Sequence, residues 1–197
     1  IDGAVYEGRP GEMDMATKYL ASVTNQAHYK GNLAGAAKGA DVLIGVSGPR
    51  LFTKEIMESM APKAVVLALA NPVPETTYEE AKAAGVLVAG TGRSDAPNQV
   101  NNVCVFPGIF RGALAVRASA ITEEMKVAAV HAISGLIPED ELREDYVVPG
   151  AFDRRIVPAI AGAVAKVAMD SGIARLQRKA EDIEKEAAER VNHNWNA

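Results

Sequence analysis

AVVLALANPVPE at residues 64–75 and VLVAGTGRSDAPNQVNN at residues 86–102 are the stretches that decide the fold. Each begins with a short apolar run, which is typical of a strand buried in a parallel sheet, and then turns polar at Asn, Gly or Pro. A third run with the same pattern, ADVLIGVSG, occupies residues 40–48. The sequence therefore predicts three buried strands, each followed by a loop of small or polar residues.

Helix signals separate the three predicted strands. Thr53 precedes an apolar-striped segment in the position of an N-cap, and Thr77 precedes two glutamates in the pattern of a capping box. Gly85 marks the end of the second of these helices. Strands that alternate with helices at this spacing predict right-handed crossovers and a parallel sheet covered on both faces. The predicted fold class is α/β: a Rossmann-like, doubly wound parallel sheet followed by C-terminal helices.

The outer parts of the chain are predicted to be largely helical. Helical spacing of apolar residues predicts a helix over residues 12–24, and small residues predict a short one over residues 33–38. A start signal with an Ala-rich middle predicts a helix over residues 121–134, and residues 155–171, apolar nearly all round, predict a buried one. Residues 174–191 instead alternate in charge around a narrow apolar seam. We expect this seam to pack on a neighbouring domain or subunit, and it consists of Leu176, Ile183 and Ala187.

The start of the chain resembles the end of a strand and its turn, over residues 1–5. A doubly wound nucleotide-binding domain needs a Gly-rich turn after its first strand and an acidic residue for the ribose, and this sequence contains neither. We therefore expect the first strand–helix unit to lie upstream of this sequence. On this basis, residues 1–173 are interpreted as an incomplete nucleotide-binding domain and residues 174–197 as a charged helical tail.

Composition narrows the classes of function. The 197 residues are 48% hydrophobic with a mean hydropathy near zero, and the formal net charge is −4. This balance fits a globular protein with a full core and argues against nucleic acid as a partner, which would require a basic face. No apolar run reaches membrane-spanning length, so no membrane partner is expected. The single cysteine, Cys104, cannot form an internal disulfide, which indicates a cytoplasmic protein, and its valine neighbours favour a packed thiol over a nucleophile.

The ends of the three predicted strands carry small and polar residues. The carboxyl ends of parallel strands meet at one edge of a sheet, and ligands of open α/β sheets bind beyond that edge. Small residues let a ligand approach the backbone, and amides supply both hydrogen-bond donors and acceptors. The sequence therefore predicts a small-molecule site formed by three loops, at residues 46–48, 70–72 and 91–93.

Structural interpretations of the same polar residues stay open at this point. Asn101 and Asn102 can cap a helix that starts at Val103, because Asn is a favoured N-cap. Asn71 with the proline after it can form a turn. Arg93 and Asp95, which lie two residues apart, can form a local ion pair that holds their loop. The three histidines of the sequence have no mutual spacing for a metal ion, and they are His28, His131 and His193.

Several motifs together resemble one family. They are DGAVYEGR (residues 2–9), GADVLIGVSGP (39–49), ALANPVPE (68–75), VAGTGRSDAPNQVNN (88–102), VFPGIFRGAL (105–114) and VPAIAGAVAKVAMDSGIA (157–174). The chain resembles, over nearly its whole length, the NAD(P)-binding domain of malic enzymes of the short bacterial or archaeal type. The resemblance implies oxidation of L-malate and decarboxylation to pyruvate and carbon dioxide, with NAD or NADP and a divalent metal, Mg²⁺ or Mn²⁺.

The resemblance also implies roles for individual residues. Asn71 is expected beside both the nicotinamide ribose and malate, and Asn102 is expected to hold a malate carboxylate. The residues implied on the cofactor side are Val46, Ser47, Gly48, Ala70, Asn71, Gly92, Arg93 and Asn101. No catalytic residue and no metal ligand is implied in this chain, because the tyrosine acid, the lysine base and three acidic ligands of the family belong to an upstream catalytic half. A homo-oligomer, dimer or larger, is also implied.

Two other functions remain as alternatives. Malolactic enzymes are similar in sequence, keep NAD bound and release lactate. A non-catalytic nucleotide-binding or assembly module would use the same fold, although the missing Gly-rich turn counts against it. The acidic residue that contacts the ribose would precede Ile1, so the sequence leaves the preference between NAD and NADP open.

Overall fold

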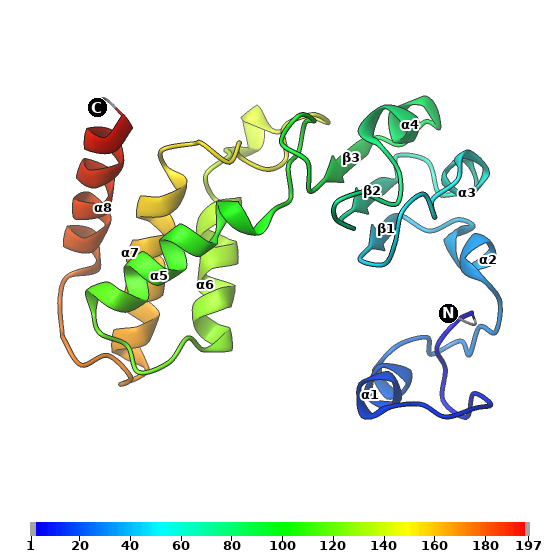
Figure 1. Ribbon diagram of the computed structural model, residues 1–197, viewed down its shortest axis with the longest axis horizontal. Helices are drawn as coiled ribbons and strands as arrows, with labels where there is room; N and C mark the ends of the chain where they lie inside the picture. The colour runs from blue at the N-terminus through cyan, green and yellow to red at the C-terminus, as the bar shows by residue number, and fades with distance from the viewer. Residues whose placement is uncertain (1–2, 196–197) are drawn as a thin grey trace.

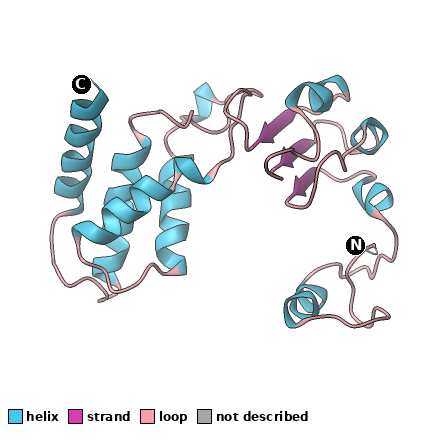
Figure 2. Cartoon of the chain, viewed as in Figure 1, coloured by secondary structure: helices cyan, strands magenta, loops and turns pink. Residues whose placement is uncertain are grey.

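The structure is a computed structural model that describes residues 3–195, with side chains described up to residue 193. Two bodies follow each other along the chain (Figure 1). The sheet body, residues 32–101, holds all three strands, and the helical body, residues 102–195, holds the four longest helices after them (Figure 2). Each body has its own cluster of buried apolar side chains.

The sheet body contains the three predicted strands. They form one parallel sheet in the order β1-β2-β3, with Val42 level with Val65 and Val65 level with Val88. The strands are β1 (Val42–Gly45), β2 (Val65–Ala68) and β3 (Val88–Thr91). The helices that connect them are α3 (Lys54–Glu58) and α4 (Tyr78–Ala83), while α2 (Leu33–Ala37) precedes β1. The parallel α/β fold predicted from the sequence is confirmed.

The helices of the sheet body cover one face of the sheet. Val66 and Ala89, which are level in neighbouring strands, are buried in one apolar cluster with Met57 of α3. The opposite face carries Val42 and Ile44, whose exposed fractions are 52% and 58%. Right-handed crossovers that step in one direction across a sheet place their helices on the same side. The expectation that both faces are covered is therefore wrong for the part of the chain that the structure describes.

The helix ends follow the signals in the sequence. Thr53 Oγ1 accepts a hydrogen bond from the backbone N–H of Ile56 at 3.4 Å. Thr77 and Glu80 form the predicted capping box, in which Thr77 Oγ1 accepts from the Glu80 N–H (3.1 Å) and Glu80 Oε2 accepts from the Thr77 N–H (3.0 Å). Gly85 follows α4 with φ of +85°, a conformation that favours glycine. These local contacts fix where the loops of the sheet body begin.

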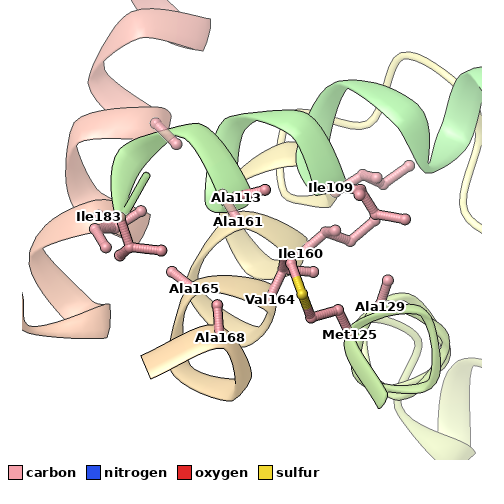
Figure 3. Packing of buried hydrophobic residues seen from close by; sticks show 13 residues of the cluster. Ile109, Ala113, Met125, Ala129, Ile160, Ala161, Val164, Ala165, Ala168 and Ile183 are labelled. Atoms are coloured by element: carbon pink, nitrogen blue, oxygen red, sulfur yellow. The ribbon is translucent and has the colours of Figure 1, made fainter. Parts of the chain in front are cut away.

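Four helices make up most of the helical body: α5 (Phe106–Ala115), α6 (Glu123–Ser134), α7 (Ile156–Asp170) and α8 (Ala180–Trp195). Helix α7 is the central element, and side chains from the other three helices converge on it (Figure 3). Met125 from α6 and Ile183 from α8 are fully buried against this cluster. The predicted seam of α8 therefore packs within the same chain through Ile183 and Ala187, not on a neighbouring domain or subunit. Leu176 remains partly exposed, at 39%.

A hydrogen-bonded junction around Asn98 connects the two bodies. Asn98, which is buried, donates from Nδ2 to the carbonyl of Ala89 in β3 (3.0 Å) and to the carbonyl of Glu144 in the helical body (2.8 Å). Its Oδ1 accepts from the N–H of Val147 at 2.8 Å. Lys82 of α4 adds an ion pair with Glu144 at 2.8 Å. The end of the sheet and the segment before α7 are thus held together by side chains distant in sequence.

The N-terminal segment stands apart from the sheet in Figure 1. It carries α1 (Met15–Val23), which begins at the N-cap Asp14 and matches the helix predicted over residues 12–24. Met15 is 88% exposed, so the apolar side of this helix lies open in the described chain. The strand end expected at residues 1–5 is not formed by residues 3–5, and residues 1–2 lie outside the described part. Within residues 3–195 no helix is long and apolar enough to cross a bilayer.

The close contact of α5 with α7 yields a stability prediction. A Cβ at Gly112 would lie 2.5 Å from the carbonyl oxygen of Ala161 and 3.0 Å from Val164 Cβ, so Gly112→Ala forces the helices apart. Overpacking of this kind costs about 1–3 kcal/mol, and each kcal/mol lowers Tm by about 2–4 °C in a chain of this size. Gly150→Ala is the matched control, because its Cβ would meet no atom within 4 Å. Equal melting temperatures for both variants would contradict this packing.

An ion pair at the start of α7 yields a prediction about pH. The Arg155 guanidinium donates to the Asp153 carboxylate (2.7–3.1 Å), to the Leu136 carbonyl (3.0 Å) and to the Tyr146 hydroxyl (3.3 Å). These hydrogen bonds from Arg155 lower the pKa of Asp153 below its ordinary value. A carboxylate whose pKa is depressed by folding stabilises the protein above its unfolded pKa, and this stabilisation disappears as pH falls through the folded pKa.

Asp153→Asn should therefore lower Tm at pH 7, by about 2–4 °C for each kcal/mol lost. The difference from wild type should begin to shrink as pH falls below the unfolded pKa of about 4, and it should disappear as pH passes through the lower pKa of Asp153 in the folded protein. Asp170→Asn is the control, because the Lys166–Asp170 pair has side chains 65% and 64% exposed and should contribute little. A Tm difference for Asp153→Asn that is constant from pH 7 to about pH 2 would exclude the linkage.

Candidate functional site

The carboxyl ends of the three strands lie together at one edge of the sheet. Gly45 is level with Ala68, and Ala68 is level with Thr91, so the three following loops leave from the same edge. The arrowheads in Figure 2 point toward the side of the helical body. A cleft of about 410 Å³ opens between the second and third loops. Its lining residues are Ala70, Asn71, Pro72, Gly92, Arg93, Ser94, Asp95, Gln99 and Asn101.

The structure divides the predicted site residues into two groups. Ala70, Asn71, Gly92, Arg93 and Asn101 all line the cleft, although 31 positions separate Ala70 from Asn101. The loop after β1 lies on the same edge but outside this cleft. The predicted residues there are Val46, Ser47 and Gly48, and Asn102 also lies outside the cleft lining.

The loop after β1 is open to solvent. Val46 is 79% exposed, and Ser47 is also exposed. A Cβ added at Gly48 would meet no atom within 4 Å, which shows that space beside this backbone is free. A flat group could therefore approach the main chain closely at this point.

Asn71 presents an unused carboxamide to the cleft. The residue is exposed, and its side chain makes no hydrogen bond with any residue in the described range 3–193. A carboxamide offers two N–H donors and one carbonyl acceptor. The turn interpretation of Asn71 and the binding interpretation are thus compatible, because the backbone turns while the side chain stays available.

Neighbouring asparagines in the third loop have different roles. Asn101 Oδ1 accepts from the Val103 N–H (3.0 Å), and its Nδ2 donates to the Gly92 carbonyl (3.0 Å). Asn101 therefore caps the short 3-10 helix η1 (Asn102–Cys104) and holds the loop closed against Gly92. Asn102 is exposed, and among the described residues its side chain has no hydrogen-bond partner. The capping interpretation holds for Asn101, and the carboxamide of Asn102 remains available to a ligand.

Arg93 forms the local ion pair that its spacing predicts. Its Nε donates to Asp95 Oδ1 at 2.8 Å, and Nη2 makes a second, shorter contact with Asp95 Oδ2. These hydrogen bonds lower the pKa of Asp95, which stays ionised and neutralises the guanidinium. Both side chains are more than half exposed on the wall of the cleft. Arg93 therefore contributes to the wall of the cleft and keeps N–H donors that Asp95 does not use, but the pair carries no net positive charge.

Sequence reasoning missed Glu75 as a residue of this edge. The side chain is completely buried, at 0% exposure, and its two oxygens accept hydrogen bonds from the backbone N–H groups of Ser47 (2.8 Å) and Ala70 (3.0 Å). It therefore connects the loop after β1 with the loop after β2. The available signal was an acidic residue directly after Pro74, in the proline-containing loop that follows a buried strand.

The described residues form neither a reactive cysteine site nor a metal site at this edge. Cys104 is buried, its Sγ lies 4.0 Å from the Gln99 carbonyl, and burial raises the pKa of its thiol. A buried thiol with a raised pKa is a poor nucleophile, in keeping with a packing role. Among residues 3–193, no three His, Cys, Asp or Glu side chains form a group that could hold a metal ion.

Comparison with known proteins gives one family. A family model described as "Malic enzyme, NAD binding domain" matches residues 2–169. The chain is 54% identical over 181 residues to the bifunctional malic/malolactic enzyme of Bacillus subtilis, covering 92% of this chain and 44% of that protein. It is 46% identical over 187 residues to the NADP-dependent malic enzyme of Haemophilus influenzae, covering 87% of this chain and 24% of that protein.

The fold agrees with these matches. The crystal structure of the malic enzyme from Pyrococcus horikoshii superposes with a TM-score of 0.81 at 41% identity, covering 91% of this chain and 41% of that one. The chain thus spans less than half the length of each of these relatives. By the extent of the family match and by fold, the chain belongs to the malic enzyme family and corresponds to its NAD-binding domain.

Proposed function

We propose that this chain is the dinucleotide-binding part of an enzyme that oxidises L-malate and decarboxylates the product to pyruvate and carbon dioxide. The observation that carries the proposal is the cleft at the carboxyl edge of the sheet, lined by Ala70, Asn71, Gly92, Arg93 and Asn101. Dinucleotides bind at this edge in open α/β sheets. Membership of the malic enzyme family supports the choice of malate as the substrate.

The residues of the edge fit a dinucleotide. Open space beside Gly48 lets a flat ligand reach the main chain, and the free carboxamide of Asn71 can exchange hydrogen bonds with ribose hydroxyls. The nicotinamide of NAD or NADP, when bound, supplies the acceptor for the hydride that leaves malate. Relatives include NAD-dependent and NADP-dependent proteins, so the proposal covers both cofactors.

Asn102 and Asn71 are proposed to orient malate. A carboxamide can donate hydrogen bonds to a carboxylate without adding a charge that would compete for it with a metal ion. Holding the reacting carbon of malate at near-attack distance from the nicotinamide lowers the barrier by removing orientational freedom. Both asparagines have unused donors in the described chain, which supports this role.

The remaining parts of the reaction are proposed to come from outside this sequence. A divalent metal, Mg²⁺ or Mn²⁺, would polarise the substrate carbonyl, and its acidic ligands would belong to an upstream catalytic half together with the acid and the base. The length of the relatives, of which this chain covers less than half, supports such a half. We also propose a homo-oligomer in the cytoplasm, for which the family and the single cysteine are the support.

Malolactic activity is a second candidate, because one relative is named a bifunctional malic/malolactic enzyme. Product analysis separates the two: pyruvate accumulates in the first case and lactate in the second. A non-catalytic module is a third candidate, and it would bind dinucleotide without any change in malate.

The test of the proposed function is the absorbance of reduced nicotinamide. Purified full-length protein that carries this sequence is mixed with L-malate, Mn²⁺ and either NAD or NADP. A steady rise with one of the cofactors is expected, with pyruvate as the product. Dinucleotide binding with neither a rise nor any lactate would favour the non-catalytic module, and lactate without a rise would favour malolactic activity.

Asn102→Ala tests the substrate side of the site. Loss of a hydrogen bond to a charged group costs about 1.5–3 kcal/mol, so the malate KM should rise by about tenfold or more while the dinucleotide KM stays within about twofold of wild type. Asn192→Ala, at an exposed position on α8, is the matched control and should change neither constant. Malate KM and kcat that both remain at wild-type values in Asn102→Ala would remove Asn102 from the substrate site.

A further inference from the structure

Glu75 ends the pairing of β1 with β2. The last backbone hydrogen bond between them runs from the Leu69 N–H to the Gly45 carbonyl at 2.9 Å. In a regular parallel ladder the next bond would run from the Ser47 N–H to the Leu69 carbonyl. Here the Ser47 N–H donates to Glu75 Oε1 instead, at 2.8 Å. A side-chain carboxylate therefore takes the place of a strand carbonyl where the two strands separate.

The second oxygen of Glu75 holds the other side of this separation. Oε2 accepts from the Ala70 N–H at 3.0 Å, so the carboxylate lies between the two loops and contacts both. The backbone of the segment is also anchored, because the Glu75 carbonyl accepts from the Phe52 N–H and the Pro74 carbonyl accepts from the Arg50 N–H, each at 3.1 Å. The position of the carboxylate is thus fixed by main-chain contacts on two sides.

Close packing leaves the carboxylate little freedom. A Cβ added at Gly45 would lie 2.4 Å from Glu75 Cδ and 2.7 Å from Phe52 Cζ, so the carboxyl group lies directly against the backbone of β1. Both oxygens act as acceptors of backbone N–H groups. No salt bridge reaches Glu75 from the Lys and Arg residues of the described chain. Its partners are the two peptides that begin the loops.

We infer that Glu75 is a positioning residue for the dinucleotide: it sets the separation of the loops after β1 and β2, and thereby the shape of the edge on which the cofactor lies. This inference rests on the proposed function of that edge. Ser47 and Ala70, whose N–H groups it holds, flank Val46, Gly48 and Asn71 on the two loops. An apolar side chain of the same size would fill the space but leave the partly buried N–H groups of Ser47 and Ala70 without their carboxylate acceptor, which is costly.

Glu75→Gln in the full-length protein is the first test. Glutamine has one acceptor oxygen, and its NH₂ group would oppose one of the two backbone N–H donors. The dissociation constant and the KM for the dinucleotide should each rise by about tenfold, and by more than the malate KM, because Asn102, the other residue proposed to orient malate, lies on a loop that Glu75 does not contact. A purely structural role would lower the melting temperature or the active fraction and leave both KM values unchanged.

Two further variants make the test specific. Gly45→Ala displaces the Glu75 carboxylate from the side of β1, because the added Cβ would clash with Glu75 Cδ. Like Glu75→Gln, it should raise the dissociation constant for the dinucleotide. Glu80→Gln is the matched control: it makes the same exchange of carboxylate for carboxamide in the capping box of α4, where glutamine also serves, and it touches neither Ser47 nor Ala70. It should lower Tm slightly and leave both KM values at wild-type levels.

Amide exchange in the unmodified protein provides a test that needs no variant. The N–H groups of Ser47 and Ala70 should exchange slowly without dinucleotide, because Glu75 holds both. Exchange of these two N–H groups at the rate of an unprotected peptide would overturn the inference. This test remains valid if Glu75→Gln does not fold.

The outcomes separate this inference from the proposed function. Wild-type protein that binds no dinucleotide would overturn both. The other outcome is that wild-type protein binds dinucleotide and that the dinucleotide constants of Glu75→Gln and Gly45→Ala stay within about twofold of the wild-type constants. This outcome would overturn only the role of Glu75.

Discussion

The common direction of the three strands is the constraint on which the site depends. Because β1, β2 and β3 are parallel and in register, Gly45, Ala68 and Thr91 end at the same edge, and every loop that follows them begins there. The same right-handed stepping places the connecting helices on one face. Polar groups from residues 46 to 101 are therefore brought together without long connections, and the buried carboxylate of Glu75 keeps the first two loops apart.

Features that depend on local chemistry were predictable from the sequence. The caps at Thr53 and Thr77 result from contacts within a few residues, and the three strands follow short apolar runs that end at polar residues. Contacts between distant residues were not predictable. Asn98 meets Glu144 and Val147 across 46 and 49 positions, and the seam of α8 finds its partner in α7. The described chain leaves Val42 and Ile44 on one sheet face exposed, and hydrophobic patterning alone does not reveal which face the connecting helices cover.

Asparagines in and before the third loop show why composition alone does not define a site. Asn98 uses its whole carboxamide to join the two bodies, and Asn101 uses its own to cap η1 and hold Gly92. Asn71 and Asn102 have the same chemistry but remain unbonded within the described chain. Binding capacity therefore depends on which donors the fold leaves unused, and that is determined by contacts between segments.

A crystal structure of the full-length protein with NAD or NADP bound tests the central claim most directly, because it locates the cofactor independently of turnover. The account predicts dinucleotide density along the carboxyl edge of the sheet, with the nicotinamide end in the cleft beside Ala70, Asn71 and Gly92. It also predicts that Glu75 still accepts from Ser47 and Ala70 in that complex. Density at any other surface, with this cleft empty, would contradict the assignment of the site.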